Sequence, residues 1–305
     1  ESNFILKNKF DTITSVFPPT TVAATTSVLT GKYPCETGWL GWRGYFMDQD
    51  AIVDMFNSNI TATSTVLTPT TWERYPVKHL KDYINEKYNE ECAVNLMGHT
   101  MFEHGKYDAK VFFSKVDDAI KHGYKYIYAY YPDPDATLHG CGNYSKETSN
   151  TIKSINDNLE QLVKNNPDVL FISIADHGHI DIKLCSLDEH SDLYDTLATP
   201  HFCEARAGMI NIKKGREKEF EKLFDKYYKE HFELYSKKEI VEKQIFGYST
   251  NYCHDYDKIL GDYLMVSKDE YTLFFENYDS SGMLSTHAGG TEREGLINIS
   301  VYNNL

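Results

Sequence analysis

The 305-residue sequence has little positive charge, no paired cysteine motif and no long apolar run. Its formal net charge of −14 argues against nucleic acid polymers and anionic membranes as general partners. The six cysteines are scattered without a Cys-x-x-Cys pair, which argues against a zinc finger and favours a reducing, cytoplasmic compartment. No segment reaches membrane-spanning length and no signal peptide is visible. Because the chain begins at Glu1, we expect that upstream residues, including a signal or a first strand, have been removed.

The overall composition is that of an ordinary globular protein, with 41% hydrophobic and 25% charged residues. The length suits one large α/β domain or two modest ones. We find no internal repeat, low-complexity tract or linker, so the simplest prediction is a single domain over residues 1–305. Parts of residues 36–123 or 180–285 could form a small cap over the site.

The stretch at residues 16–34 predicts a strand end, a tight turn and a short helix. Two prolines after Phe17 prevent the strand from continuing. Thr20 or Thr21 can then cap a helix that ends before Gly31. A hydroxyl at a helix N-terminus lies beside free N–H groups that favour a phosphate-like anion. A capped helix without any chemistry is the alternative.

The rest of the chain predicts alternating strands and helices. Strands are expected near residues 64–67, 92–97, 124–131, 168–175, 205–212, 262–266, 271–275 and 296–302, and helices near 77–88, 114–121, 144–164 and 216–228. The run at 168–175 is almost continuously apolar, which is typical of a parallel strand buried on both faces. Residues 38–46, rich in glycine and aromatics, suit a loop over a cleft or a surface loop anchored by two tryptophans.

Acidic and imidazole side chains follow the strands at 124–131 and 168–175. Asp135-x-x-x-His139 comes after the first, and Asp176-His177 directly after the second. Parallel strands deliver their C-terminal loops to one sheet edge, so these residues should converge. His287 lies in a later loop between the last two strands. Mixed nitrogen and oxygen ligands of this type suit zinc, with manganese or iron as further options.

Five other histidines are not expected to be metal ligands. His99 and His104 have no usual ligand spacing and are expected in a solvated loop. His179, His190 and His201 are expected on the surface, with a supporting or substrate-binding role as the alternative.

Together, four separated motifs resemble the alkaline phosphatase superfamily, and within it the type I phosphodiesterase/nucleotide pyrophosphatase branch. They are Phe17–Gly31, Pro134-Asp135-x-x-x-His139, Asp176-His177-Gly178 and His287-Ala288-Gly289. The resemblance implies a three-layer α/β/α sandwich with a mostly parallel central sheet. It also implies a phosphoric ester hydrolase with two divalent ions, most simply Zn²⁺, and a covalent phospho-enzyme intermediate.

The resemblance also implies roles for particular residues. The nucleophile falls on Thr21, with Thr20 as the alternative. The metal ligands implied are Asp135, His139 and His287 for one ion, and Asp176, His177 and the Thr21 oxygen for the other. Thr20, Thr25 and Trp42 are candidates for substrate binding. Metal coordination lowers the pKa of a bound hydroxyl, so a threonine can attack at neutral pH.

Two departures from the family pattern affect these expectations. The given sequence starts too late to contain the Asp-Gly that the family places at the end of a first strand as a ligand of the second metal, so either this residue lies upstream or the second site is incomplete. Ala24 stands where phosphodiesterases of this branch usually have an asparagine that holds a phosphoryl oxygen. Thr25 or a backbone N–H could take over that contact.

Other activities on the same scaffold remain open. Gly289-Gly290-Thr291 resembles phosphomutase-like members, and a phosphomonoesterase or a phosphonate hydrolase is also possible. Monoesterases often add a cation, and only Arg43 and Arg206 lie near plausible cleft segments. A sulfatase is not expected, since there is no Cys-x-Pro-x-Arg segment. A metal-binding member without turnover is the last alternative. In each case the expected partner is a small phosphorylated molecule, and the oligomeric state is open.

Overall fold

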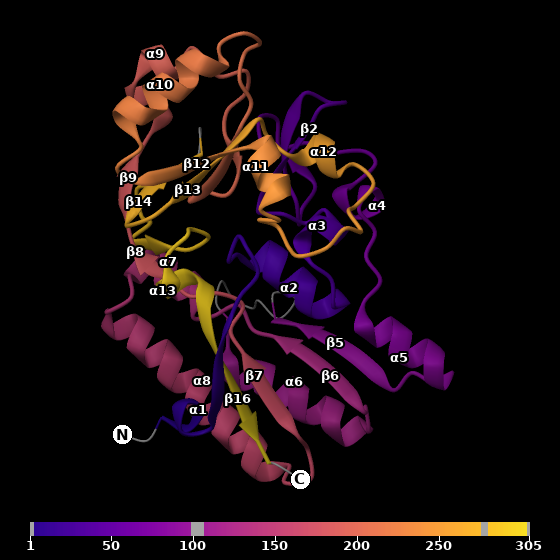
Figure 1. Ribbon diagram of the computed structural model, residues 1–305. Helices are drawn as coiled ribbons and strands as arrows, with labels where there is room; N and C mark the ends of the chain where they lie inside the picture. Colours follow the sequence, from indigo (N-terminus) through magenta and orange to yellow (C-terminus); the bar gives the residue numbers. More distant parts are fainter. Residues whose placement is uncertain (1–2, 99–106, 276–279, 304–305) are drawn as a thin grey trace.

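The computed structural model describes residues 3–98, 107–275 and 280–303, and most of its strands form two groups (Figure 1). In the first group, β1 (Lys9–Thr14), β16 (Leu296–Tyr302) and β7 (Phe171–Ile174) form an antiparallel sheet. Beside it, β5 (Ala93–Met97) and β6 (Tyr126–Tyr130) form a parallel pair. Helices α6 (Ala109–His122) and α8 (Lys146–Asn165) pack on these strands through Phe112, Val116 and Leu162.

The second group is a seven-stranded sheet in the order β12-β13-β11-β10-β2-β3-β4. Its strands are β2 (Arg43–Phe46), β3 (Ala51–Asp54), β4 (Asn59–Ile60), β10 (Phe202–Cys203), β11 (Ala207–Ile210), β12 (Phe232–Ser236) and β13 (Tyr263–Ser267). Every ladder in this sheet is antiparallel. Helix α10 (Glu217–Tyr227) covers it with Phe220 and Phe224.

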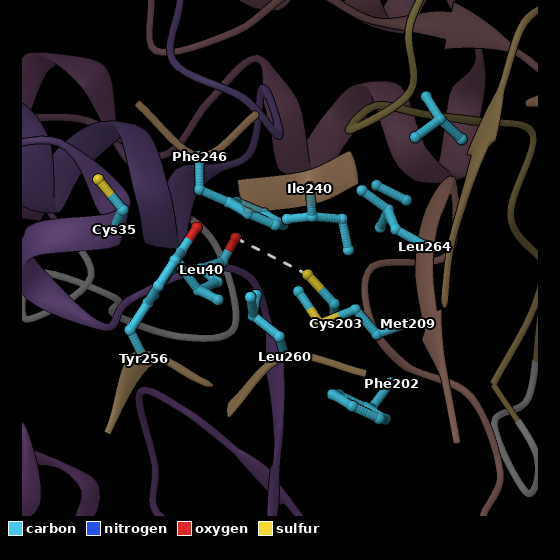
Figure 2. Close-up of a cluster of buried hydrophobic side chains, with 12 residues drawn as sticks. Cys35, Leu40, Phe202, Cys203, Met209, Ile240, Phe246, Tyr256, Leu260 and Leu264 are labelled. Carbon is cyan, nitrogen blue, oxygen red and sulfur yellow. Dashed lines mark hydrogen bonds between the residues drawn. The ribbon is translucent and has the colours of Figure 1, made fainter. Parts of the chain in front are cut away.

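An apolar cluster joins this sheet to the segment that follows the Thr-rich helix. Figure 2 shows Cys35 and Leu40 together with Phe202, Ile240 and Leu264 in this cluster. Phe17 packs against the same cluster from outside. The turn that begins after Phe17 is therefore anchored in a buried core rather than in a free loop.

The remaining elements are short, apart from α2 and α5. They are α1 (Phe4–Lys7), α2 (Thr21–Thr30), α3 (Pro34–Thr37), α4 (Thr71–Arg74), α5 (Leu80–Tyr88), α7 (Asp135–Cys141), β8 (Ile180–Asp181), β9 (Lys183–Cys185), η2 (Leu187–Glu189), α9 (Ser191–Tyr194), α11 (Lys237–Glu242), α12 (Tyr256–Ile259), β14 (Tyr271–Leu273), β15 (Ser285–Thr286) and α13 (Glu292–Gly295). Among the described helices, none combines the length and apolarity needed to cross a bilayer.

The expected α/β class is confirmed, but its sheets are mixed. Only β5–β6 and β14–β9 pair in parallel among the described strands. The prediction that strand 168–175 is buried on both faces is wrong. Ile172 and Ile174 of β7 are 58% and 42% exposed, because α8 covers one face and no described element covers the other.

Several local predictions also need correction. The first strand ends at Thr14 rather than Phe17. The strand expected at 64–67 is reduced to a single bridge between Val66 and Asn59. The loop expected after Pro134 is helix α7, and the loop expected at 38–46 contains β2. His99 and His104 lie outside the described residues.

Candidate metal centre

The Thr-rich helix α2 presents Thr21 at its first turn. Thr20 is the residue before the helix, in extended conformation, and its hydroxyl does not cap the helix. The Thr21 Oγ1 lies 3.1 Å from Nε2 of His177. Gly31 ends the helix in the left-handed conformation with φ of 70°, as its position in the sequence predicts.

A single carboxylate oxygen stands at the centre of the site. Oδ1 of Asp135 lies 3.3 Å from Nε2 of His139, 3.0 Å from Nε2 of His179 and 3.5 Å from Nε2 of His287. Nε2 of His177 is 4.0 Å away. Asp135 and His139 face each other because they are one turn apart on α7. The ligand atoms of Asp135, His139, His179 and His287 all lie within 4.8 Å of one another.

Backbone carbonyl groups hold three of these rings from behind. The Nδ1 atoms of His139, His177 and His287 lie 2.9, 2.9 and 3.1 Å from the carbonyl oxygens of Ser285, Gly178 and Pro19. A carbonyl oxygen only accepts hydrogen bonds, so each Nδ1 carries the hydrogen and each neutral ring keeps a lone pair on Nε2. This is the usual support for a metal-bound histidine. The donor set of imidazoles and a carboxylate fits zinc, and also manganese or iron.

Burial and mutual charge shift the pKa values within the group. Burial raises the pKa of Asp135, but its close contacts with His139 and His179 outweigh burial and hold this pKa well below its usual range. Burial, followed by the charge of His177, lowers the pKa of His287 well below that of free histidine. An ionised carboxylate and a neutral imidazole are the forms that bind a metal ion.

Asp176 lies just after the end of β7, beside His177. Its Oδ2 is buried without a hydrogen-bond partner among the described residues and lies 3.4 Å from Nε2 of His177. Its backbone carbonyl accepts a 2.5 Å hydrogen bond from the Ser15 hydroxyl. Tyr130 lies beside it, and burial, followed by the charge of Asp176, raises the pKa of this phenol. A buried carboxylate oxygen without a partner is costly unless something binds it.

Glu204 is a buried carboxyl group that sequence reasoning missed. Its Oε1 accepts hydrogen bonds of 2.7 Å from the Thr20 hydroxyl and of 2.7 Å from the backbone N–H of Trp42. Burial raises the pKa of Glu204 to about 7. The residue follows Cys203, whose φ is 76°, and no sequence motif marks it.

The three residues expected to bind substrate differ in accessibility. The Thr20 side chain is buried and donates to Glu204. The Thr25 hydroxyl is also buried and donates to the Thr21 carbonyl at 2.6 Å. The Trp42 ring is 38% exposed and packs edge-on against Phe56.

Neither arginine near the site reaches into it as a lone cation. Arg206 is fully buried and binds Glu294 through Nε at 2.7 Å and Nη2 at 3.0 Å. The same Glu294 accepts the Gly289 N–H at 2.6 Å, which fixes the segment after His287. A Cβ at Gly289 would lie only 2.7 Å from Arg206 Nη2. Arg43 is paired with Asp54 at 3.1 Å.

The expectation that three further histidines lie on the surface is wrong for two of them. His179 belongs to the Asp135 cluster, and its side chain is 4% exposed. His201 is buried, and its Nε2 has no partner among the described residues. His190 is half-buried and stacks on Tyr227. His179 stands two residues after His177, and this spacing past a strand is the signal that could have indicated it.

Comparisons with known proteins agree with the resemblance in the sequence. A family profile described as type I phosphodiesterase/nucleotide pyrophosphatase matches residues 7–291. The structure of murine ectonucleotide pyrophosphatase/phosphodiesterase 5 superposes with a TM-score of 0.71 at 15% identity, over 98% of this chain and 81% of that chain. An inactive threonine-to-alanine variant of the murine protein, in complex with AMP, gives 0.69 at 15% identity over the same shares.

The human counterpart of that protein gives a TM-score of 0.67 at 16% identity, over 95% of this chain and 78% of that chain. A search of curated protein sequences finds no significant match. At these identities the structural likeness establishes the fold alone.

Proposed function

Because the chain belongs to the type I phosphodiesterase/nucleotide pyrophosphatase family, we propose that Thr21 attacks a phosphodiester or pyrophosphate bond of a small nucleotide, assisted by two zinc ions. The family is one of phosphoric ester hydrolases. The observation that carries the proposal is the 3.1 Å separation of Thr21 Oγ1 and His177 Nε2 at the edge of the Asp135 cluster. The inactive threonine-to-alanine variant of the murine neighbour, in complex with AMP, supports both a threonine and a nucleotide.

Two sets of ligands would hold the ions. Asp135, His139 and His287 form the first set. Asp176 and His177 form the second with the Thr21 oxygen, and the buried Asp176 Oδ2 without a partner supports it. Two bound zinc ions would lower the pKa of the threonine hydroxyl and stabilise the leaving oxygen. Manganese or iron would suit the same donors.

The protein groups around Thr21 would position the substrate. The first N–H groups of α2 have no partner within the helix, so they are available to phosphoryl oxygens. Glu204 fixes Thr20 and the backbone of Trp42 at once, so it holds the turn before the nucleophile in place. The half-exposed Trp42 ring is the candidate to contact a base, since indole offers a large apolar face.

A diester or pyrophosphate suits this site better than a monoester. A phosphomonoester carries an additional negative charge, and both arginines near the site are already paired with carboxylates. The activities of a phosphomutase or a phosphonate hydrolase have no separate support in the geometry. If the experiment below detects no hydrolysis, the protein is instead a member of the family that binds metal without turnover.

Four further proposals concern the surroundings of the site. We propose that the two groups of strands belong to one alkaline phosphatase-like domain over residues 1–305, built as a three-layer sandwich. The seven-stranded sheet, formed by residues 43–60 and 202–267, would be its cap. A cytoplasmic location is supported by six free cysteines. A small nucleotide rather than a nucleic acid polymer is the expected partner.

The test compares hydrolysis by the wild type and by the Thr21→Ala variant. Thr250 is an exposed threonine in a loop, so Thr250→Ala is the matched control. Bis-p-nitrophenyl phosphate, p-nitrophenyl phosphate, phosphonoacetate and ATP serve as substrates. We expect the diester and ATP to be cleaved by wild type and control, and not by Thr21→Ala, whose metal content should be nearly unchanged. Retained activity in Thr21→Ala would show that the nucleophile is Thr20 or another residue.

A further inference from the structure

The ring of His179 is held on both sides by groups of the site. Its Nδ1 lies 2.8 Å from the Ser285 hydroxyl oxygen, and its Nε2 lies 3.0 Å from Oδ1 of Asp135. The Ser285 hydroxyl itself donates to the Leu138 carbonyl at 2.7 Å. A serine has one hydroxyl hydrogen, so toward His179 its oxygen can only accept. Nδ1 of His179 therefore carries the hydrogen, and a neutral His179 keeps its lone pair on Nε2.

This lone pair points at an oxygen that already faces other lone pairs. Oδ1 of Asp135 also lies 3.3 Å from Nε2 of His139 and 3.5 Å from Nε2 of His287. Both rings keep lone pairs on Nε2, because backbone carbonyl groups accept from their Nδ1 atoms. Lone pairs that converge at this distance repel one another unless positive charge lies among them. One cation bound by all four groups removes the repulsion.

Pairing of two short strands that are distant in the sequence brings His179 to this place. Strand β8 pairs antiparallel with β15, with Ile180 opposite Thr286. The residue before Ile180 and the residue after Thr286 are therefore neighbours at the same end of the ladder. These residues are His179 and His287, whose ring centroids are 5.3 Å apart. The fold thus places both rings beside α7.

We infer that His179 is a fourth protein ligand of the metal ion held by Asp135, His139 and His287. The inference rests on the metal site of the proposed function, but not on the reaction. Four protein ligands complete a tetrahedral zinc shell, so a substrate oxygen can bind this ion only if the shell expands to five. Within the described part of the chain, the other proposed site has Asp176 and His177 as ligands besides Thr21. The ion bound with His179 is therefore the last to leave when a chelator is added.

The decisive experiment is diffraction at the zinc absorption edge on zinc-soaked crystals of the unchanged protein. We expect an anomalous peak about 2.1 Å from Nε2 of His179 and at bonding distance from the other three ligands. A peak that contacts only Asp135, His139 and His287, with Nε2 of His179 outside bonding distance of the ion, overturns this inference and leaves the proposed function standing. A map without any peak at the site overturns both.

Competition with a colorimetric zinc chelator supplies a second measurement. His179→Gln should weaken the tighter zinc site on the order of tenfold or more, the range that the loss of even a supporting residue produces. His122→Gln, at the exposed end of α6, is the matched control and should retain wild-type affinity. Circular dichroism checks that both variants fold. Unchanged zinc affinity in a folded His179→Gln variant contradicts the inference.

Discussion

The buried carboxyl group of Glu204 allows a sharp test of the electrostatics of the site. In the metal-free protein, burial raises its pKa from 4.5 to about 7. The folded chain therefore keeps a proton that the unfolded chain releases near pH 4.5. The free energy of unfolding is therefore highest below pH 4.5, and it decreases as the pH rises through about 7. This rise in the pKa from 4.5 to about 7 corresponds to a loss of about 3 kcal/mol.

The substitution Glu204→Gln should remove this loss. The amide oxygen of glutamine can still accept from the Thr20 hydroxyl and the Trp42 N–H, so the two 2.7 Å hydrogen bonds are retained. Glutamine does not ionise. Relative to wild type, the free energy of unfolding of the variant should therefore increase by about 3 kcal/mol as the pH rises from 4.5 to 8.

Urea unfolding of the chelator-treated proteins at several pH values measures the difference directly. Glu242→Gln, an exposed carboxylate on α11, controls for the loss of one acidic side chain. If the difference between Glu204→Gln and wild type is the same at pH 5 and pH 8, burial does not set the charge of Glu204 and the reasoning fails. Positive charge near a buried carboxylate lowers its pKa, so saturating zinc should reduce the pH dependence.

Two further substitutions test the second metal site and the support of His287. Asp176→Asn should lower the zinc content, measured by atomic absorption, by about one ion per chain, because it removes the anionic ligand of the second site; an unchanged content would refute that assignment. Arg206→Met should lower the free energy of unfolding in urea by about 3–5 kcal/mol, because it leaves the Glu294 carboxylate buried without its partner. A loss below about 1 kcal/mol would show that Glu294 finds another partner.

Local signals in the sequence were sufficient for the part of the site that follows secondary structure directly. Two prolines and Gly31 mark the bounds of the helix that carries Thr21. Residues at strand ends were expected to converge, and the distances from Asp135 to His139, His177 and His287 show that they lie together. Their roles as ligands and nucleophile stay predictions.

Features that depend on distant pairing could not be predicted from the sequence. Strands β2 and β10 are neighbours in the seven-stranded sheet, although the residues that pair, Arg43 and Cys203, lie far apart in the sequence. Their short, irregular sequences carry no alternating pattern that would indicate a strand. The alternating exposure of β7 has the same origin, since an apolar run does not reveal whether a second layer covers it.

Charge and residue type alone also do not separate a substrate-binding group from a structural one. Arg206 was a candidate cation for the cleft, yet its guanidinium group is bound by Glu294 and donates to the Tyr271 carbonyl oxygen, 2.9 Å from Nη1. His179 was expected on the surface, yet the β8–β15 register places it against Asp135. In both cases the partner lies more than 40 residues away along the chain, and only the tertiary fold determines which charge it meets. Glu204, which binds Thr20, and Tyr130, which lies beside Asp176, carried no motif and were missed for the same reason.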